Sequence, residues 1–204
     1  MGGASSSSLA MTLCLAVLAI APNAAESFLT QVVDRWKEQS EIRYEFRTVR
    51  VAKKTGKSDL LEKGRAFYHR QSEFFVELTD VQEKIRGTVG RDPSGERYSN
   101  AVGGSGVGTA NTALGFGDSI PAHWAYQPVL VADSDELGRF HVFHDSTPKA
   151  ATFRGNRCWL TVATEGNAQT TIWWDEKTLF PIRIQEDWPK WFRVTVFEKV
   201  KLTK

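Results

Sequence analysis

The sequence of 204 residues predicts a mainly β protein of the α+β class, built as a half-open antiparallel β-barrel or a strongly curved sheet of about ten strands. One segment near the start, 28–36, carries apolar residues at helical spacing. From residue 42 the apolar period changes to two, and short alternating segments separated by turn residues continue to the end of the chain. Such a sheet needs a cover over its apolar face, so we expect an N-terminal helix and a lid segment over the concave side.

Each predicted element follows from local spacing. The helix starts after Ser27, an N-cap residue, and the clearest strand alternates Ile42, Tyr44 and Phe46 with charged residues. Turn residues predict tight turns at 53–57, 91–95 and 175–178. Further strand-like segments lie at 64–69, 74–78, 84–89, 96–99, 139–144, 151–154, 157–164, 169–174, 181–186 and 191–202.

The first 25 residues predict a secretion signal. An uncharged apolar run covers 9–21 and is followed by Pro22 and small residues, which is the order of a signal peptide's hydrophobic and cleavage regions. The run is shorter than the roughly 20 residues that a membrane-spanning helix needs, so a permanent anchor is the poorer interpretation. We expect cleavage after Ala24 or Ala25, a periplasmic location and a single domain over 26–204.

Composition limits the classes of partner and chemistry. The formal net charge of +2 gives no nucleic-acid footprint, so we expect no nucleic-acid partner. We also expect a monomer. Cys14 falls in the predicted signal, which leaves Cys158 alone and excludes an intramolecular disulfide. A lone thiol in a strand-like segment is typical of a small buried apolar residue.

No segment predicts catalysis. The glycine-rich segment 103–117 predicts a flexible loop, and no Lys-Ser or Lys-Thr follows it as a phosphate-binding loop requires. His141, His144 and Asp145 resemble metal ligands, but in a strand the two histidines would point to opposite faces, so we interpret them as surface or edge residues, with a metal site as the alternative. There is no G-x-S-x-G elbow. We therefore expect no enzyme, no catalytic residue, no metal and no cofactor, with an envelope hydrolase as the minor alternative.

Large aromatic side chains recur in the predicted strands. Most are interpreted as core, but the adjacent pairs Trp173-Trp174 and Trp191-Phe192 must face both sides of their strands. Some aromatic surface therefore needs a cover from helices, loops or a ligand.

Two stretches resemble the periplasmic lipoprotein carriers of the LolA-like superfamily. Gly64 leads into HRQSEFFVE at His69 to Glu77, where Arg70 and Phe74 match the family's basic and aromatic positions and Gln71 replaces its proline. TTIWWDEKTLFPIRIQED at Thr170 to Asp187 is similar to the family's late hairpin, with an Asp-x-x-Thr turn and Pro181 at the start of the next strand.

This resemblance implies a half-open barrel that shelters the acyl chains of lipoproteins or free lipid, with possible inner- and outer-membrane sorting components as partners. It implies that Arg70 fastens the lid, the alternative being a solvent-exposed arginine at a strand end. An extracytoplasmic sensor or scaffold that binds a protein through the same face is the alternative function. The apolar cavity would be lined by Ile42, Tyr44, Phe46, Phe74, Val76, Ile172 and Trp174.

Overall fold

The computed structural model describes residues 24–70, 72–79, 82, 84–95, 97–101, 104–106, 123–133 and 138–204. The helices are α1 (Ala24–Lys37), α3 (His123–Asp133) and the 3₁₀-helix η1 (Gly138–Phe143). The strands are β1 (Glu41–Ala52), β2 (Ser58–His69), β3 (Phe74–Thr79), β4 (Ile85–Arg91), β5 (Arg97–Ala101), β6 (Gly104–Gly106), β7 (Lys149–Phe153), β8 (Asn156–Glu165), β9 (Ala168–Asp175), β10 (Pro181–Asp187) and β11 (Trp191–Thr203). The predicted signal segment lies almost entirely outside the described residues.

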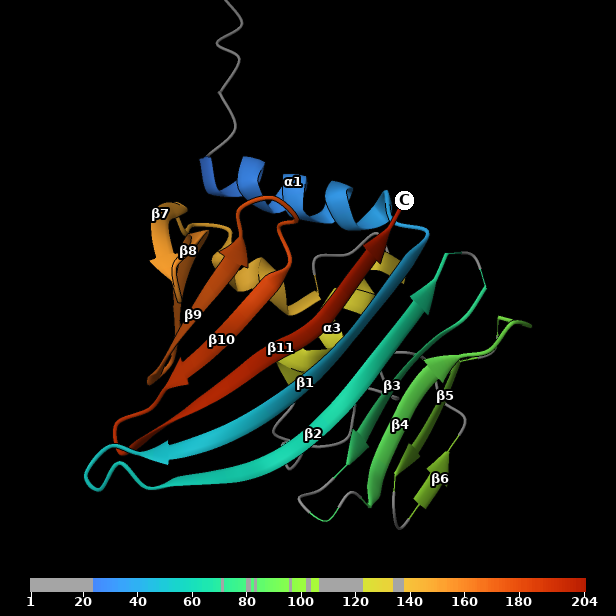
Figure 1. Cartoon of the computed structure of the whole chain (residues 1–204), viewed down its shortest axis with the longest axis horizontal. Helices are drawn as coiled ribbons and strands as arrows, with labels where there is room; N and C mark the ends of the chain where they lie inside the picture. The colour runs from blue at the N-terminus through green and yellow to red at the C-terminus, as the bar shows by residue number, and fades with distance from the viewer. Residues whose placement is uncertain are drawn as a thin grey trace, which may run out of the picture.

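In the described part of the chain, eleven strands form one sheet in the order β6-β5-β4-β3-β2-β1-β11-β10-β9-β8-β7. The sheet is curved and does not close into a barrel (Figure 1). Its central pair joins the two ends of the chain, because β1 lies antiparallel to β11, with Phe46 opposite Phe197 and Ala52 opposite Trp191. The middle of the sheet therefore forms only when the last strand is present.

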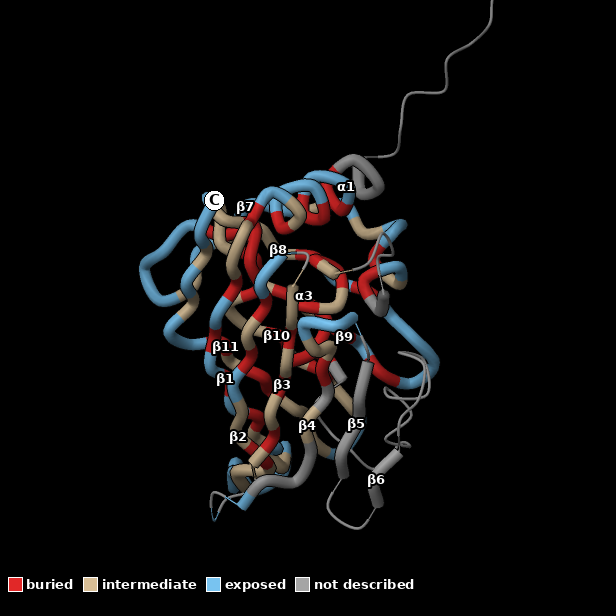
Figure 2. The backbone as a smooth tube through the Cα atoms, turned by 90° about the vertical axis from the view of Figure 1, so that its right-hand side faces the viewer, coloured by how far each residue is buried: buried red, intermediate tan, exposed pale blue. Residues whose placement is uncertain are grey.

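The helices lie on the concave side of this sheet. Helix α1 crosses one end of the strands and α3 lies behind β1 and β11 in the view of Figure 1. Buried residues follow the strands and both helices through the interior, while outer loops and the far side of α1 are exposed (Figure 2). Alternation along β1 explains the division, since Ile42, Tyr44 and Phe46 are buried and the residues between them are exposed.

Gly64 allows β2 to pass close to its neighbours. A Cβ atom at this position would lie 2.2 Å from Cζ of Phe46 and 2.3 Å from the main-chain oxygen of Glu77, both far inside van der Waals contact. The Phe46 ring therefore occupies space that any other residue at 64 would fill. The conformation of β1, β2 and β3 at this point depends on a residue without a side chain.

The structure confirms the predicted fold class and corrects two elements. The segment 139–144 is not a strand but η1, in which Phe140 and Phe143 are both buried because residues three apart share one face of a 3₁₀-helix. A second helix, α3, was not predicted. Three residues of the glycine-rich segment, Gly104–Gly106, pair with β5, and the remainder of 103–117 lies outside the described residues.

Candidate functional site

The structure brings the seven residues predicted to line a cavity together on the concave face. They come from β1, β3 and β9, and each is between 0 and 3% exposed: Ile42, Tyr44, Phe46, Phe74, Val76, Ile172 and Trp174. All seven belong to one continuous core that also contains apolar residues of α1, α3 and η1. The residues that would contact a ligand are therefore covered in this structure by the protein's own helices.

Aromatic rings make up much of this covered face. Trp36 of α1 lies 5.5 Å from Phe140 and 5.7 Å from Phe180 between ring centroids. Tyr44 of β1 lies 5.3 Å from the same Phe180. Trp174 anchors the far side through its indole nitrogen, which donates to Oγ1 of Thr161 at 2.8 Å. The contacts connect the β1 half of the sheet to the β9 half through the helices.

Helix α3 is buried on nearly all sides, and from Trp124 to Ala132 only Leu130 is partly exposed. Its apolar residues do not form a single stripe, and Pro128 lies inside it. Proline has no N–H to donate to the preceding turn, so one hydrogen bond is missing in the middle of the helix. This combination explains why sequence periodicity did not predict α3.

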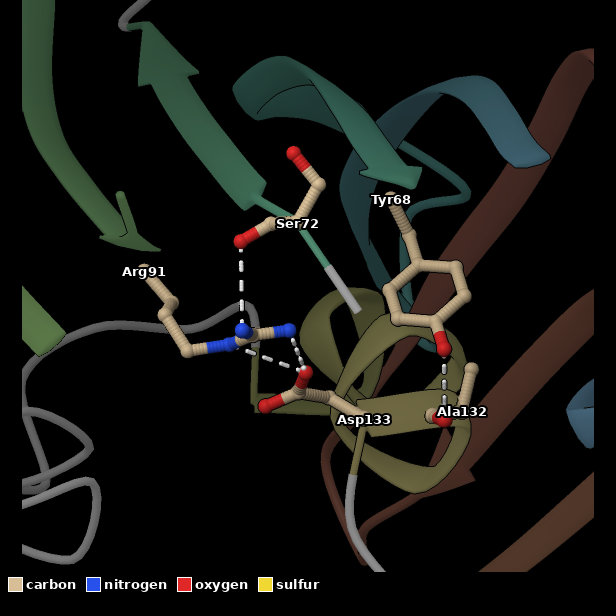
Figure 3. A network of polar contacts seen from close by, with 5 residues as sticks. All are labelled: Tyr68, Ser72, Arg91, Ala132 and Asp133. Carbon is tan, nitrogen blue, oxygen red and sulfur yellow. Dashed lines mark hydrogen bonds and ion pairs between the residues drawn. The ribbon is translucent and has the colours of Figure 1, made fainter. Parts of the chain in front are cut away.

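Three side chains of the sheet attach α3 to the concave face. Tyr44 donates its hydroxyl to the main-chain oxygen of Ala125 at 2.6 Å, and Tyr68 donates to that of Ala132 at 3.0 Å. Figure 3 shows the second attachment at the end of the helix, where Arg91 of β4 bonds Oδ1 of Asp133 through Nε at 3.1 Å. Both ends of the described helix are thereby held by polar groups of the sheet.

Arg91 also connects this point to the loop between β2 and β3. Its Nη1 donates to the main-chain oxygen of Ser72 at 3.1 Å. The Asp133 carboxylate is 5% exposed and the Arg91 side chain 17%, so the ion pair is largely shielded from water. The family resemblance had pointed to Arg70 for this role, and nothing in the sequence distinguishes Arg91 from other strand arginines.

Arg70 is exposed in the turn after β2. Its main-chain N–H donates to the oxygen of Ser40 at 2.9 Å. Its side chain lines a shallow surface depression with Asp34 and Glu38 of α1. Burial and the charge of Asp133 raise the pKa of Tyr68, and the nearby Arg70 acts in the opposite direction. Arg70 therefore lies beside the hydroxyl that bonds α3, and its role as a lid fastener stays a prediction.

A polar cluster interrupts the apolar concave face towards the β1–β2 hairpin. The hydroxyls of Thr48 and Thr195 are 3.1 Å apart, and Glu62 lies opposite Thr48 on β2. Arg193 of β11 pairs with Glu186 of β10 at 3.2 Å. Burial raises the pKa of Glu62 to about 7, against the lowering effects of Thr48 and Arg193. No pattern in the sequence had marked this cluster.

The candidate metal ligands occupy an exposed position. His141 lies in η1, and His144 and Asp145 lie in the turn that follows it, with 2.9 Å between Nδ1 of His144 and Oδ1 of Asp145. The described residues contain no group of three or more histidine, cysteine, aspartate or glutamate side chains placed to hold a metal.

The convex face carries a shallow groove of about 440 Å³ whose lining includes Arg43, Arg65, Phe67 and Phe75. Arg43 lies 4.7 Å from the centroid of the Phe67 ring. Arg65 pairs with Glu77 at 3.0 Å. Because its cations have carboxylate partners on the same surface, the groove lacks the unpaired charge that would mark an anion site.

The fold and the covered face define a class of protein: one curved antiparallel sheet whose aromatic concave side is closed by helices. No protein-family model matches the sequence, and no match is found among curated proteins. In the described part of the chain, no helix has the length and apolar character to span a membrane.

Solved structures with a similar arrangement include members of the LolA superfamily, the family that the sequence resembles. A LolA superfamily protein from Nitrosomonas europaea shares 9% identity over 88% of this chain and 94% of its own, with a TM-score of 0.38. The Mycobacterium tuberculosis lipoprotein LppX shares 12% identity over 88% and 96%, with a TM-score of 0.46. The Pseudomonas aeruginosa MucA/MucB complex shares 10% identity over 88% of this chain and 57% of the matched chain, with a TM-score of 0.48.

Proposed function

We propose that this protein is an exported carrier that shelters the acyl chains of a lipid or lipoprotein against the concave face of its sheet, with α3 as the movable cover. The observation that carries the proposal is a continuous apolar face closed by a helix whose described attachments include two tyrosine hydroxyls and one ion pair. A cover held in this way can detach without loss of the sheet hydrogen bonds.

The free energy lost when α3 opens and the free energy gained when an acyl chain binds are comparable in size. Opening α3 exposes apolar side chains of both the helix and the sheet, and each fully buried side chain of this kind contributes about 1.5 to 3 kcal/mol. An acyl chain that enters beneath the loosened helix recovers roughly 0.8 kcal/mol per buried methylene. A chain of about ten methylenes thus offsets the loss of three or four helix side chains. Cargo is then held reversibly, as transfer between membranes requires.

Export and exchange partners belong to the same proposal. The apolar run at 9–21 directs the chain out of the cytoplasm, and cargo is exchanged with components of the inner and outer membranes. N-terminal sequencing of the protein from the cell envelope should begin near residue 25 or 26. A product that retains the first 20 residues would contradict export by a cleaved signal.

Binding is tested with a hydrocarbon probe that has no polar head, such as dodecylpyrene. The purified protein should take up the probe in proportion to protein concentration, and lipid should be found by mass spectrometry of the protein isolated from its native envelope. A protein that takes up no probe and copurifies with a stable protein partner instead of lipid would overturn the carrier and favour the scaffold function.

The role of α3 is tested by loosening its attachments. Tyr44→Phe combined with Tyr68→Phe removes two hydrogen bonds to α3, each contributing about 1 kcal/mol. Probe uptake should become about tenfold faster or more. Thr79→Val is the matched control, because it removes a side-chain hydrogen bond to the main-chain oxygen of Lys63, between β3 and β2, and none to α3. Its loss should leave uptake unchanged. Equal rates in all three proteins would show that α3 does not limit entry.

A further inference from the structure

Among the described residues, two buried side-chain oxygens of the covered face have no hydrogen-bond partner. One is Oε1 of Glu62, on a residue that is 6% exposed, and the other is the hydroxyl of Tyr126, on a residue that is 2% exposed. An unpaired polar atom in such a position costs about 1 to 3 kcal/mol. An apolar residue in either position would avoid this cost, so both oxygens are candidates for contact with a bound molecule.

The two atoms belong to neighbouring surfaces of the closed interior. Glu62 projects from β2, and Tyr126 projects from α3, which contacts β2. Burial raises the pKa of the Tyr126 hydroxyl, and the charge of Glu62 adds to this effect. Glu62 and Tyr126 are therefore within electrostatic reach of each other where the sheet meets the cover.

The charges around this region favour one kind of group. Arg193 is paired with Glu186, and its charge also acts on Glu62. One arginine thus faces two carboxylates, which leaves an excess of negative charge among these three groups. The Thr48 hydroxyl is a hydrogen-bond partner of Glu62 and acts to lower the pKa of the Glu62 carboxyl. A group that enters here meets a carboxylate oxygen able to accept and a phenol able to accept or donate. An anionic group would meet a like charge in a shielded site.

We propose that the Glu62–Tyr126 region receives the polar end of the bound amphiphile, and that this end is a hydrogen-bond donor without negative charge, either an ammonium or a hydroxyl group. The inference rests on the proposed carrier function, since the apolar part of the same molecule lies along the concave face. Glu62 accepts from the donor, and Tyr126 completes its coordination. The site thereby selects among amphiphiles with equal hydrocarbon chains.

The test compares decylamine, decanol and decanoate, which share one chain length and differ in the head group. Each displaces dodecylpyrene from the purified protein at pH 8. Decylammonium should bind about tenfold more tightly than decanoate, because a charge-assisted hydrogen bond replaces a like-charge contact. Equal affinities for the three compounds would overturn the proposal.

Two variants locate the effect. Glu62→Gln removes the charge but keeps an accepting oxygen, so it should weaken decylammonium about tenfold and leave decanol within about twofold. Glu62→Leu removes the acceptor and should weaken both. Glu77→Gln on the convex face is the matched control and should change neither affinity. Variants that bind all compounds like the wild type would also overturn the proposal.

The two proposals fail differently in this experiment. If dodecylpyrene and decanol do not bind to the wild type, the carrier function itself is wrong. If they bind but neither the head group nor Glu62 alters affinity, the carrier function stands and the polar site is wrong. Urea denaturation of each variant shows whether it is folded, so a lost affinity is interpreted only for a protein with a cooperative unfolding transition.

Discussion

Trp173 and Trp174 are neighbours on β9 and lie on opposite faces of the sheet. Trp174 is completely buried against Trp36 and Phe140. Trp173 remains partly exposed, with the Arg183 guanidinium 4.9 Å from its ring centroid. The same side chain is thus core on one face and a platform for a cation on the other. Burial by the helices, and not residue type, decides which aromatic residues stabilise the fold.

Charged groups also differ between the two faces of the sheet. On the convex face they form exposed pairs, such as Arg47 with Glu198 at 2.9 Å, where water screens the attraction. On the concave face Glu62 is shielded, and its charge is costly enough to raise its pKa to about 7. Charge is inexpensive on one side of the sheet and destabilising on the other, so a buried carboxylate on the concave side needs a functional reason.

The largest predicted difference comes from the two tryptophans. Trp174→Ala should lower the free energy of unfolding by about 3 to 5 kcal/mol, because it leaves a large cavity in the core. Trp173→Ala should cost about 1 kcal/mol, the size of an exposed cation–π contact with modest packing. Urea denaturation of both variants measures the two values. Equal losses would show that the faces do not differ as described.

The second prediction concerns pH. The pKa of Glu62 is about 7 in the folded protein, above its ordinary value of 4.5, so the folded state binds this proton more tightly. The contribution of Glu62 to the stability of the folded state is therefore most favourable below pH 4.5, decreases as the pH rises to 7, and is constant above that. Thr48, Arg193, Glu186 and Tyr126 are the polar and charged groups of the surrounding elements and are unchanged in the variant.

Glu62→Gln removes this titration. At pH 8 the variant should be more stable than the wild type by up to about 3 kcal/mol, and the difference should shrink towards zero at pH 5. Denaturation curves of both proteins at the two pH values provide the measurement. A difference that does not change with pH would mean that Glu62 is not shielded from water.

Gly64→Ala tests the close approach of β1, β2 and β3. The added methyl group would collide with the Phe46 ring and with the main chain at Glu77. We expect a loss of about 2 kcal/mol, typical of overpacking. Gly56→Ala is the comparison variant. A Cβ atom at Gly56 meets nothing within 4 Å, but its φ is +67°, so a loss at this position comes from left-handed backbone strain and not from a collision. Thermal unfolding compares them, and a smaller loss at 64 than at 56 would contradict the packing account.

The smallest predicted effect is that of a convex ion pair. A double-mutant cycle with Arg47→Ala and Glu198→Ala should give a coupling of about 0.2 to 1 kcal/mol at low salt. The coupling should vanish at high ionic strength, where exposed charges are screened. A larger coupling that persists in salt would remove the contrast with Glu62.

The sequence predicted the elements whose signal is local. The alternation of Ile42, Tyr44 and Phe46 was confirmed as the inner face of β1, because a strand with one buried face repeats every two residues. The turn at 175–178 was confirmed by Oδ1 of Asp175, which accepts from the main-chain N–H of Thr178 at 2.7 Å. The helix predicted from Phe28 was found as the later part of α1.

Local sequence patterns did not predict two elements, α3 and η1, or the ion pair that attaches α3 to the sheet. Helix α3 is buried on nearly all sides, so it has no polar stripe to reveal its period, and Pro128 argues against a helix. The spacing of residues 139–144 predicted a strand. The segment is a 3₁₀-helix instead, and Phe140 and Phe143 are both buried on one face of it. The pairing of Arg91 with Asp133 spans 42 positions, and no local pattern relates them.

The sequence by itself thus determined most of the strands, their turns and their apolar faces, because alternation and turn chemistry act between near neighbours. Only the tertiary structure decided what covers the concave face and which groups hold the cover. It also decided that one carboxylate oxygen of Glu62 is buried without a hydrogen-bond partner. These features depend on segments that are far apart in the chain, and burial of a charge is a property of the whole fold and not of the residue.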